Sequence, residues 1–174
     1  MNPCTLPTYT RFASISEDGK YRWVLARVWD ANKPMACFVM LNPSTADSET
    51  DDPTIRKCNG FAHRLGFGSI SVVNLFAYRS TYPRDLLEAE DPVGTEFNDK
   101  LILSVTKTLI ARGGLTIVGW GGSVPAKLSA RVPYVVSMLR DNGIPLYSLR
   151  FNRDGSPAHP LMLPYSCKPV RFGL

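Results

Sequence analysis

The sequence lacks the patterns that usually identify a metal centre, a membrane segment or a secreted protein. It has 4 cysteines and 2 histidines, and the cysteines are scattered without a C-x-x-C pair, at Cys4, Cys37, Cys58 and Cys167. That spacing argues against a zinc site. No apolar run approaches the roughly 20 residues that span a bilayer, and the N-terminal segment has no signal-peptide pattern. We therefore expect a cytoplasmic protein with reduced cysteines, no membrane partner, no metal and no other cofactor.

Several catalytic motifs are also missing. The chain has no G-x-S-x-G elbow, and Gly119-Trp120-Gly121-Gly122 matches neither the G-x-G-x-x-G nor the G-x-x-x-x-G-K-[ST] phosphate loop. Cys37 and Cys58 fall on apolar faces of predicted elements, so we do not expect a nucleophilic cysteine. These absences argue against common hydrolase and phosphate-loop chemistry and leave the polar loops as the place for a site.

Length and charge set broad limits. A chain of 174 residues with 44% hydrophobic residues predicts one soluble globular domain. The formal net charge of +5 permits a polyanionic partner without requiring one. Residues 150–174 are basic and residues 47–52 are acidic. This contrast is compatible with a basic rim beside an acidic pocket mouth, and also with two solvated surfaces.

Residues 10–34 predict a β-hairpin that precedes the core. Two segments rich in β-branched and aromatic residues, 10–16 and 21–29, flank Asp18-Gly19, which is a typical hairpin turn. A further turn leads into the apolar run Ala36 to Leu41. We expect the hairpin to add antiparallel strands to an otherwise parallel sheet, and we interpret its role as structural.

Four apolar runs then alternate with three amphipathic segments. The predicted strands cover residues 36–41, 69–75, 115–118 and 144–149, and the predicted helices cover 53–65, 95–112 and 125–142. In the second helix we expect one apolar face, formed by Phe97, Leu101, Val105 and Leu109, and in the third helix a break at Pro133.

This alternation predicts an α/β three-layer sandwich around a four-stranded parallel sheet of order 2-1-3-4. We expect a single domain over residues 1–174. It would comprise the hairpin at 10–34, the α/β core at 35–165 and a C-terminal tail at 166–174.

Polar or loop-forming residues stand where each predicted parallel strand ends. Pro43 stops the first strand because it lacks the N–H donor that a central ladder needs. The residues at these ends are Asn42, Pro43, Ser44 and Asp47 after the first strand, Asn74 and Arg79 at the second, Trp120 after the third and His159 after the fourth. Carboxyl ends of parallel strands share one edge of the sheet, where ligands bind. We therefore expect these residues to form one site, although Asn42-Pro43 also reads as a simple strand stop and Asn74 as the partner of a backbone group.

Four of these segments resemble the uracil-DNA glycosylase superfamily in order and spacing. They are Asn42-Pro43, V-V-N-L-F at 72–76, V-G-W-G at 118–121 and H-P-L-M-L at 159–163. The chain from M-L-N-P-S-T-A-D through D-D-P-T to V-V-N-L-F-A-Y-R is also similar, over roughly residues 10–165, to the bacterial family called domain of unknown function 1643. Met40-Leu41 and Ser44-Thr45 depart from the glycosylase pattern, so uracil itself is not implied.

The glycosylase resemblance implies a role for each matching residue. Asn42 would position a water molecule, and Asn74 would hydrogen-bond a flipped base along its Watson–Crick edge. His159 would stabilise negative charge on the departing base. Leu163 would be the apolar wedge that enters the duplex.

Other residues are assigned by inference rather than by a motif. Because an asparagine cannot take a proton from water, Asp47 or Asp51 would act as the base, unless both are loop caps. Phe76 or Tyr78 would stack on the base, and Ser44 and Arg79 would contribute to the binding surface.

The leading hypothesis is a uracil-DNA-glycosylase-like protein that binds a nucleobase or nucleic acid and hydrolyses an N-glycosidic bond. One alternative is a non-catalytic nucleic-acid-binding module, with salt-sensitive binding and no base release. Another is an enzyme acting on a free nucleotide or another small polar ligand, with a deep pocket and no affinity for DNA. The sequence carries no signal for an oligomeric state.

Overall fold

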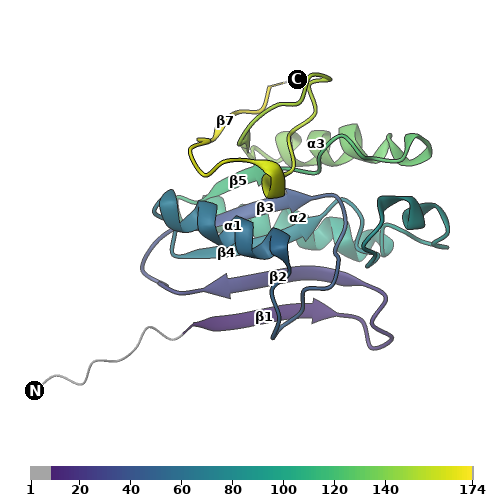
Figure 1. The fold of residues 1–174 in the computed structure, drawn as a ribbon, viewed down its shortest axis with the longest axis horizontal. Helices are drawn as coiled ribbons and strands as arrows, with labels where there is room; N and C mark the ends of the chain where they lie inside the picture. The colour runs from purple at the N-terminus through teal and green to yellow at the C-terminus, as the bar shows by residue number, and fades with distance from the viewer. Residues whose placement is uncertain (1–8, 174) are drawn as a thin grey trace, which may run out of the picture.

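A computed structural model describes residues 9–173. Its centre is a seven-stranded mixed sheet with the order β1-β2-β4-β3-β5-β6-β7 (Figure 1). The strands are β1 Thr10–Ile15, β2 Arg22–Val28, β3 Met35–Met40, β4 Ser69–Asn74, β5 Leu115–Val118, β6 Leu146–Ser148 and β7 Val170–Arg171. Strands β4, β3, β5 and β6 run parallel to one another, in the relative order expected for them. The α/β class is therefore confirmed.

The expectation that the hairpin adds antiparallel strands to the parallel sheet is confirmed, but the sheet is larger than the four predicted parallel strands and the hairpin together. The hairpin is part of the same sheet, because β2 pairs antiparallel with β4, Leu25 lying opposite Val72. At the other edge, β7 pairs antiparallel with β6, so the predicted C-terminal tail contributes a strand at Val170–Arg171. Both additions cover strand edges that would otherwise expose unpaired backbone groups.

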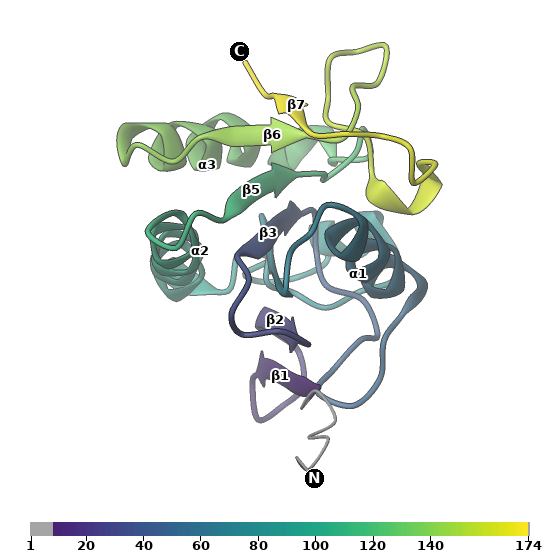
Figure 2. The same ribbon diagram turned by 90° about the vertical axis from the view of Figure 1, so that its left-hand side faces the viewer.

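Helices cover both faces of the sheet (Figure 2). Helix α1, Pro53–Arg64, lies on one face, and α2, Thr95–Ile110, and α3, Arg131–Asp141, lie on the other. Short 3-10 turns complete the set: η1 Pro83–Leu87, η2 Ala126–Leu128 and η3 Pro160–Met162. Within residues 9–173 no helix has the length and apolar character needed to cross a membrane.

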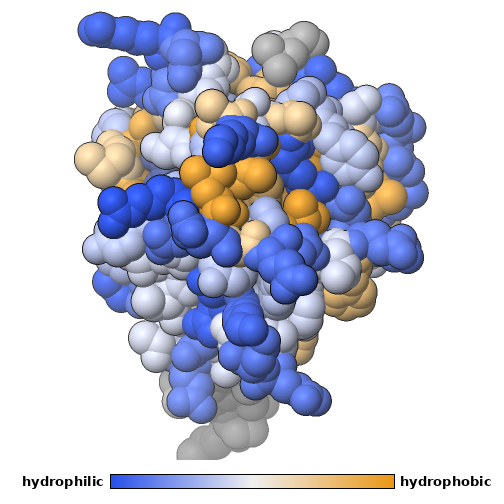
Figure 3. Space-filling view, turned by 90° about the vertical axis from the view of Figure 1, so that its right-hand side faces the viewer, coloured by the Kyte–Doolittle hydropathy of each residue, from blue (hydrophilic) through white to orange (hydrophobic). Residues whose placement is uncertain are grey.

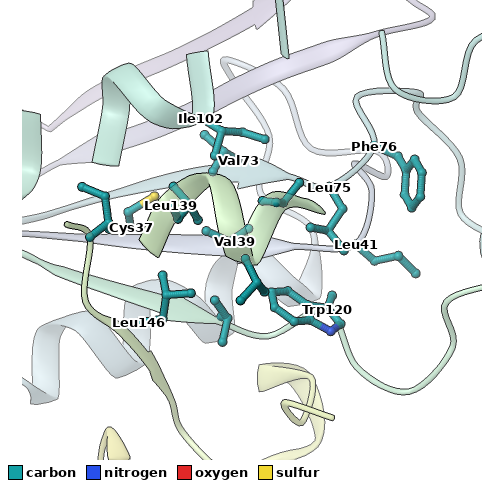
Figure 4. Close-up of a cluster of buried hydrophobic side chains, with 14 of the residues drawn as sticks. Cys37, Val39, Leu41, Val73, Leu75, Phe76, Ile102, Trp120, Leu139 and Leu146 are labelled. Carbon is teal, nitrogen blue, oxygen red and sulfur yellow. The ribbon is translucent and has the colours of Figure 1, made fainter. Parts of the chain in front are cut away.

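Each face of the sheet has its own hydrophobic cluster. Alternate side chains of a strand point to opposite faces, so Phe38 packs with Ile55 and Phe61 of α1. Val39 packs on the other face, with residues of α2 and α3 (Figure 4). The apolar face predicted for α2 is wrong at Phe97, which is 47% exposed. The buried side chains of this helix are Asn98, Ile102, Thr106 and Leu109.

The helix starts follow local rules. Asp52 caps α1, since its Oδ1 accepts a hydrogen bond from the backbone N–H of Ile55 at 2.8 Å, and Pro53 occupies the first turn. Helix α3 begins at Arg131, after η2. The predicted break therefore lies before Pro133 rather than at it, because proline is tolerated in the first turn of a helix.

A buried arginine fixes the long loop from β3 to α1. Arg27 of β2 is fully buried. Its Nη2 lies 2.7 Å from Asp51 Oδ1 and donates to the backbone oxygen of Asp47 at 2.6 Å. Both partners belong to the loop that carries Asn42 and Asp52 to the carboxyl edge of the sheet. The position of that loop therefore depends on Arg27.

Replacing Arg27 by methionine is expected to lower the free energy of unfolding by about 3–5 kcal/mol, because Asp51 loses its buried partner. Urea denaturation followed by circular dichroism measures the change. Lys33→Met is the matched control, since Lys33 and its partner Asp30 form a pair with side chains 57% and 31% exposed, and such pairs contribute little. Equal stability of the Arg27→Met variant and the wild type would contradict this role.

Candidate functional site

A cavity of about 710 Å³ opens at the carboxyl ends of the parallel strands. Its walls come from the β3–α1 loop, the end of β4, the β5–η2 loop and the β6–η3 loop. Figure 3, which looks at the molecule from the right-hand side of Figure 1, shows apolar side chains gathered near the middle of this face with hydrophilic ones around them. This edge is where α/β sheets bind ligands.

The cavity brings together part of the predicted site. The predicted residues that line it are Asn42, Ser44, Asn74, Trp120, His159 and Leu163. They come from all four strand ends, as the topology predicts. The predicted residues outside its lining are Pro43, Asp47, Phe76, Tyr78 and Arg79.

Asn42 has a fixed orientation at the cavity wall. Its Nδ2 donates to the backbone oxygen of Ser80 at 2.8 Å and to that of Pro43 at 3.2 Å. Both N–H groups of the amide are thus used, which leaves Oδ1 to accept a hydrogen bond. Asn42 can orient a water molecule or a ligand N–H, but it cannot take up a proton.

Asn74 is the most buried polar residue of the predicted site. Its side chain is 1% exposed, and its Oδ1 has no hydrogen-bond partner among residues 9–173. Buried polar atoms are nearly always paired, because an unpaired one loses its hydration without compensation. An acceptor of this kind at the wall of a cavity is suited to a ligand N–H group.

Trp120 forms an apolar part of the cavity wall. It is 3% exposed and its ring packs edge-to-face against Phe172, with centroids 5.7 Å apart. This packing holds the indole in one place, since two neighbouring aromatic rings restrict each other.

His159 is held as a neutral hydrogen-bond donor. Its Nδ1 accepts a hydrogen bond from the backbone N–H of Leu161 at 3.3 Å, at the start of η3. The proton of the neutral ring is therefore on Nε2. Burial lowers the pKa of His159 below its ordinary value, and the negative charge of Asp52 opposes this effect. A neutral imidazole can donate to a developing oxyanion without first losing a proton.

The titration of His159 is expected to have its midpoint below 6.5. NMR of its ring Hε1 proton measures this, with a His63→Gln variant to assign the signal, since the chain has 2 histidines. Because the unfolded chain takes up this proton at higher pH, the stability that His159 contributes is complete above 6.5 and is lost as the pH falls toward the folded-state pKa. A midpoint above 6.5 would contradict the buried neutral ring.

The two predicted bases are engaged elsewhere. Asp47 Oδ1 accepts hydrogen bonds from the backbone N–H groups of Glu49 and Thr50, both at 2.8 Å. These bonds lower the pKa of Asp47, and Asp51 pairs with Arg27. Neither aspartate lines the cavity, so their roles are those of a loop cap and an ion-pair partner.

The predicted stacking residues also lie outside the cavity. Phe76 is 1% exposed and belongs to the core between the sheet and α2. Tyr78 packs edge-to-face on Tyr21, with ring centroids 5.9 Å apart. Neither residue is among those that line the cavity, so neither ring is placed to stack on a ligand there. The stacking prediction is therefore wrong.

Pro43 and Arg79 hold the loops around the cavity. The buried Pro43 accepts a hydrogen bond at its backbone oxygen from the N–H of Ser80, at 2.9 Å. Arg79 donates to the backbone oxygen of Gly19 at 3.1 Å and to that of Ser44 at 3.4 Å. Both residues position the β3–α1 loop instead of facing a ligand.

The wedge role implied for Leu163 does not fit the structure. Leu163 is 5% exposed and packs in the cluster beneath α1, where it lines the cavity from inside. The apolar residue that protrudes from the same turn is Met162, which is 83% exposed. Burial of Leu163 follows from its place at the end of η3, which packs against α1.

Sequence reasoning missed two charged residues of the cavity. Arg22 comes from the hairpin, for which the sequence predicts a structural role, and the sequence predicts Asp52 only as a helix cap. Arg22 is 2% exposed, and burial lowers its pKa to about 10, which leaves it charged at neutral pH. Asp52 is the one acidic side chain among the described residues that line the cavity. The signal for Arg22 was a charged residue in the apolar strand pattern R-W-V-L-A-R-V.

The buried cysteines of the core are not suited to act as nucleophiles. Cys37 and Cys58 are fully buried, and burial raises the pKa of the Cys37 thiol to about 12. Thiols of this kind are poor nucleophiles at neutral pH. Within residues 9–173 no group of three or more His, Cys, Asp or Glu side chains is placed to hold a metal ion.

Comparison with curated proteins gives no match. Among solved structures, the hetero-hexameric glutamate dehydrogenase from Thermus thermophilus in its leucine-bound form is similar at 16% identity and a TM-score of 0.28. The match covers 77% of this chain but only 31% of that chain, and a likeness this weak carries no argument. The family described as "Protein of unknown function (DUF1643)" matches residues 22–161. The chain therefore belongs to the DUF1643 family.

Proposed function

We propose that the cavity binds a nucleobase and that the protein hydrolyses the N-glycosidic bond of that base in a nucleic acid. One observation carries the proposal: Asn42, Asn74 and His159 come from three separate strand ends and line one cavity together with Trp120. This is the constellation that the resemblance to uracil-DNA glycosylases implies. The volume of about 710 Å³ falls within the range of small-ligand sites.

Binding of the base uses Asn74 and Trp120. The unpaired Oδ1 of Asn74 accepts a ring N–H of the base, and the amide plane matches the planar edge of a nucleobase. Trp120 supplies the apolar wall. A base in this position gives the buried amide oxygen a hydrogen-bond donor. Binding therefore removes the free-energy cost of an unpaired buried acceptor.

The leaving group is stabilised by His159. As the bond between the sugar carbon and the ring nitrogen breaks, its electron pair passes to the base and negative charge collects on a base oxygen. The neutral Nε2–H of His159 donates to that oxygen. The donor is in place before the charge develops, so little reorganisation is needed.

Water activation uses Asn42 and Asp52. The Oδ1 of Asn42 accepts a hydrogen bond from the attacking water and orients it. The water oxygen forms the new bond to the sugar carbon, and its proton passes to the carboxylate of Asp52. One oxygen of that carboxylate caps α1. Asp52 then releases its proton to the solvent and the departing base takes one up, which balances the reaction.

The cavity mouth suits a nucleic acid. Arg150 and Arg153 are exposed at its rim, and Phe151 between them is 38% exposed. Arginine side chains bind phosphate groups, and an exposed aromatic ring stacks on bases. The same features support the alternative of a nucleic-acid-binding module without catalysis.

An abasic-site assay tests the proposal. The protein is incubated with oligonucleotides that carry uracil, hypoxanthine, oxidised or alkylated bases, in single- and double-stranded form, and alkaline treatment then cleaves abasic sites. Cleavage of one substrate class is the expected result. DNA retention that weakens with salt, without cleavage, would favour the binding module. If the protein neither cleaves nor retains any oligonucleotide, the proposal is overturned in favour of a free nucleotide or another small ligand.

A further inference from the structure

A β-bulge directs Arg22 into the cavity. In the pairing of β1 with β2, Ser14 lies opposite Val24 and Ile15 lies opposite Arg22, so the register skips one residue of β2. A bulge of this kind reverses the facing of the residues beyond it. Val24 packs with the cluster on the α2 face, whereas Arg22 lines the cavity beside Asp52 and Ile55 of the α1 side.

The side chain of Arg22 is buried but only partly paired. It is 2% exposed, and its Nη1 donates to the backbone oxygen of Ala46 at 2.9 Å. Its Nε has no partner among residues 9–173. Several buried side-chain atoms within residues 9–173 have no hydrogen-bond partner. Two of them, Arg22 Nε and Asn74 Oδ1, belong to residues that line the cavity. One is a donor and the other is an acceptor.

The two orphaned atoms differ in what they can select. An asparagine amide can turn over and present either its oxygen or its nitrogen, so Asn74 alone accepts both keto and amino edges of a base. A guanidinium has donors only, and its charge favours an oxygen that carries negative charge. Arg22 would therefore favour a keto edge over an amino edge, a choice that Asn74 alone does not make.

We propose that Arg22 is a specificity-determining residue that donates from Nε to a ring carbonyl oxygen, so that the cavity selects bases in which a carbonyl stands beside a ring N–H. Adenine and cytosine carry an amino group in that place. This inference rests on the proposed function in assuming that a nucleobase occupies the cavity. It makes the bulged hairpin part of the binding site.

Calorimetric titration with free bases tests the inference. For the wild type we expect at least about tenfold tighter binding of uracil than of cytosine or 3-methyluracil, and of hypoxanthine than of adenine, since a mismatched edge leaves buried polar atoms unpaired. Equal affinity for the keto and amino partners, or no measurable binding of either keto base, would overturn the inference. This part needs no variant and so does not depend on folding.

Variants then assign the selectivity to Arg22. Arg22→Gln is expected to bring the keto-to-amino affinity ratio to within about threefold of unity, because an amide both donates and accepts. Arg22→Lys retains a charged donor and is expected to restore most of the ratio. Arg112→Gln is the matched control for the loss of a guanidinium, since Arg112 is exposed just after α2 and outside the cavity lining. An unchanged ratio in Arg22→Gln would overturn the role.

The two proposals fail in different ways. Selective binding of free keto bases without any abasic site would overturn the hydrolysis and leave the role of Arg22 in place. Base release that is indifferent to Arg22→Gln, with keto and amino bases released alike, would overturn only the role of Arg22.

Discussion

Asp52→Asn is expected to slow base release by about 10²–10⁴-fold, the range that a general base contributes. Asparagine caps a helix as well as aspartate does, so α1 keeps the hydrogen bond from the N–H of Ile55. The fold and the affinity for the oligonucleotide should therefore be unchanged. Single-turnover kinetics with excess protein measure the rate, and a gel shift measures the affinity.

Asp47→Asn is the matched control for Asp52. Asp47 lies on the same loop but caps it through Glu49 and Thr50 outside the cavity lining. Its replacement should leave the single-turnover rate within about twofold of the wild type. A large loss in Asp47→Asn with little loss in Asp52→Asn would assign the base to Asp47 and contradict the structural assignment.

His159→Ala is expected to reduce the single-turnover rate by about 10²–10³-fold, as the loss of one oxyanion donor does. Binding of the intact oligonucleotide should fall far less, because the donor acts mainly on charge that appears in the transition state. The measurement compares the rate at saturating protein with the dissociation constant from a gel shift, and so separates chemistry from binding.

His63→Ala serves as the control for histidine loss in general. His63 stacks on Trp29, with ring centroids 3.9 Å apart, away from the cavity lining. We expect its rate to match that of the wild type. Unchanged turnover in His159→Ala would remove the leaving-group role and with it the assignment of the cavity as a glycosylase site.

Local sequence patterns predict the elements of this fold well. Asp52-Pro53 marks the start of α1 because capping and a fixed proline φ are local properties. The run Leu115–Val118 matches β5 because a continuous apolar run is typical of a buried parallel strand. The hairpin turn at Asp18-Gly19 is likewise set by Gly19, which has a positive φ of 73°.

Features that depend on distant contacts are missed. Strand β7 is only two residues long, Val170–Arg171, and exists because β6 offers it an unpaired edge. The sequence pattern predicts Phe97 on the apolar face of α2, yet the buried positions include Asn98, whose Nδ2 donates to the backbone oxygens of Asn74 and Leu75. A buried polar residue that makes such a contact interrupts the apolar periodicity, so the buried face of the helix cannot be predicted from that periodicity.

The candidate site likewise contains residues that local sequence predicts and residues that depend on distant contacts. Strand ends with polar residues are visible in the sequence, and Asn42, Asn74 and His159 were found by that signal. The bulge that turns Arg22 toward the cavity leaves no hydrophobic pattern, and the choice among Asp47, Asp51 and Asp52 depends on how Arg27 holds the loop. Neither could be read from spacing alone.

Whether a nucleobase binds in this cavity is tested most directly by titrating isotopically labelled protein with free uracil and hypoxanthine and following the titration by NMR. We expect the largest shifts on the side-chain amide of Asn74, the indole N–H of Trp120 and the ring of His159, with the indole of Trp29 unchanged. Shifts confined to another face of the molecule, or none at saturating base, would contradict a nucleobase site in this cavity.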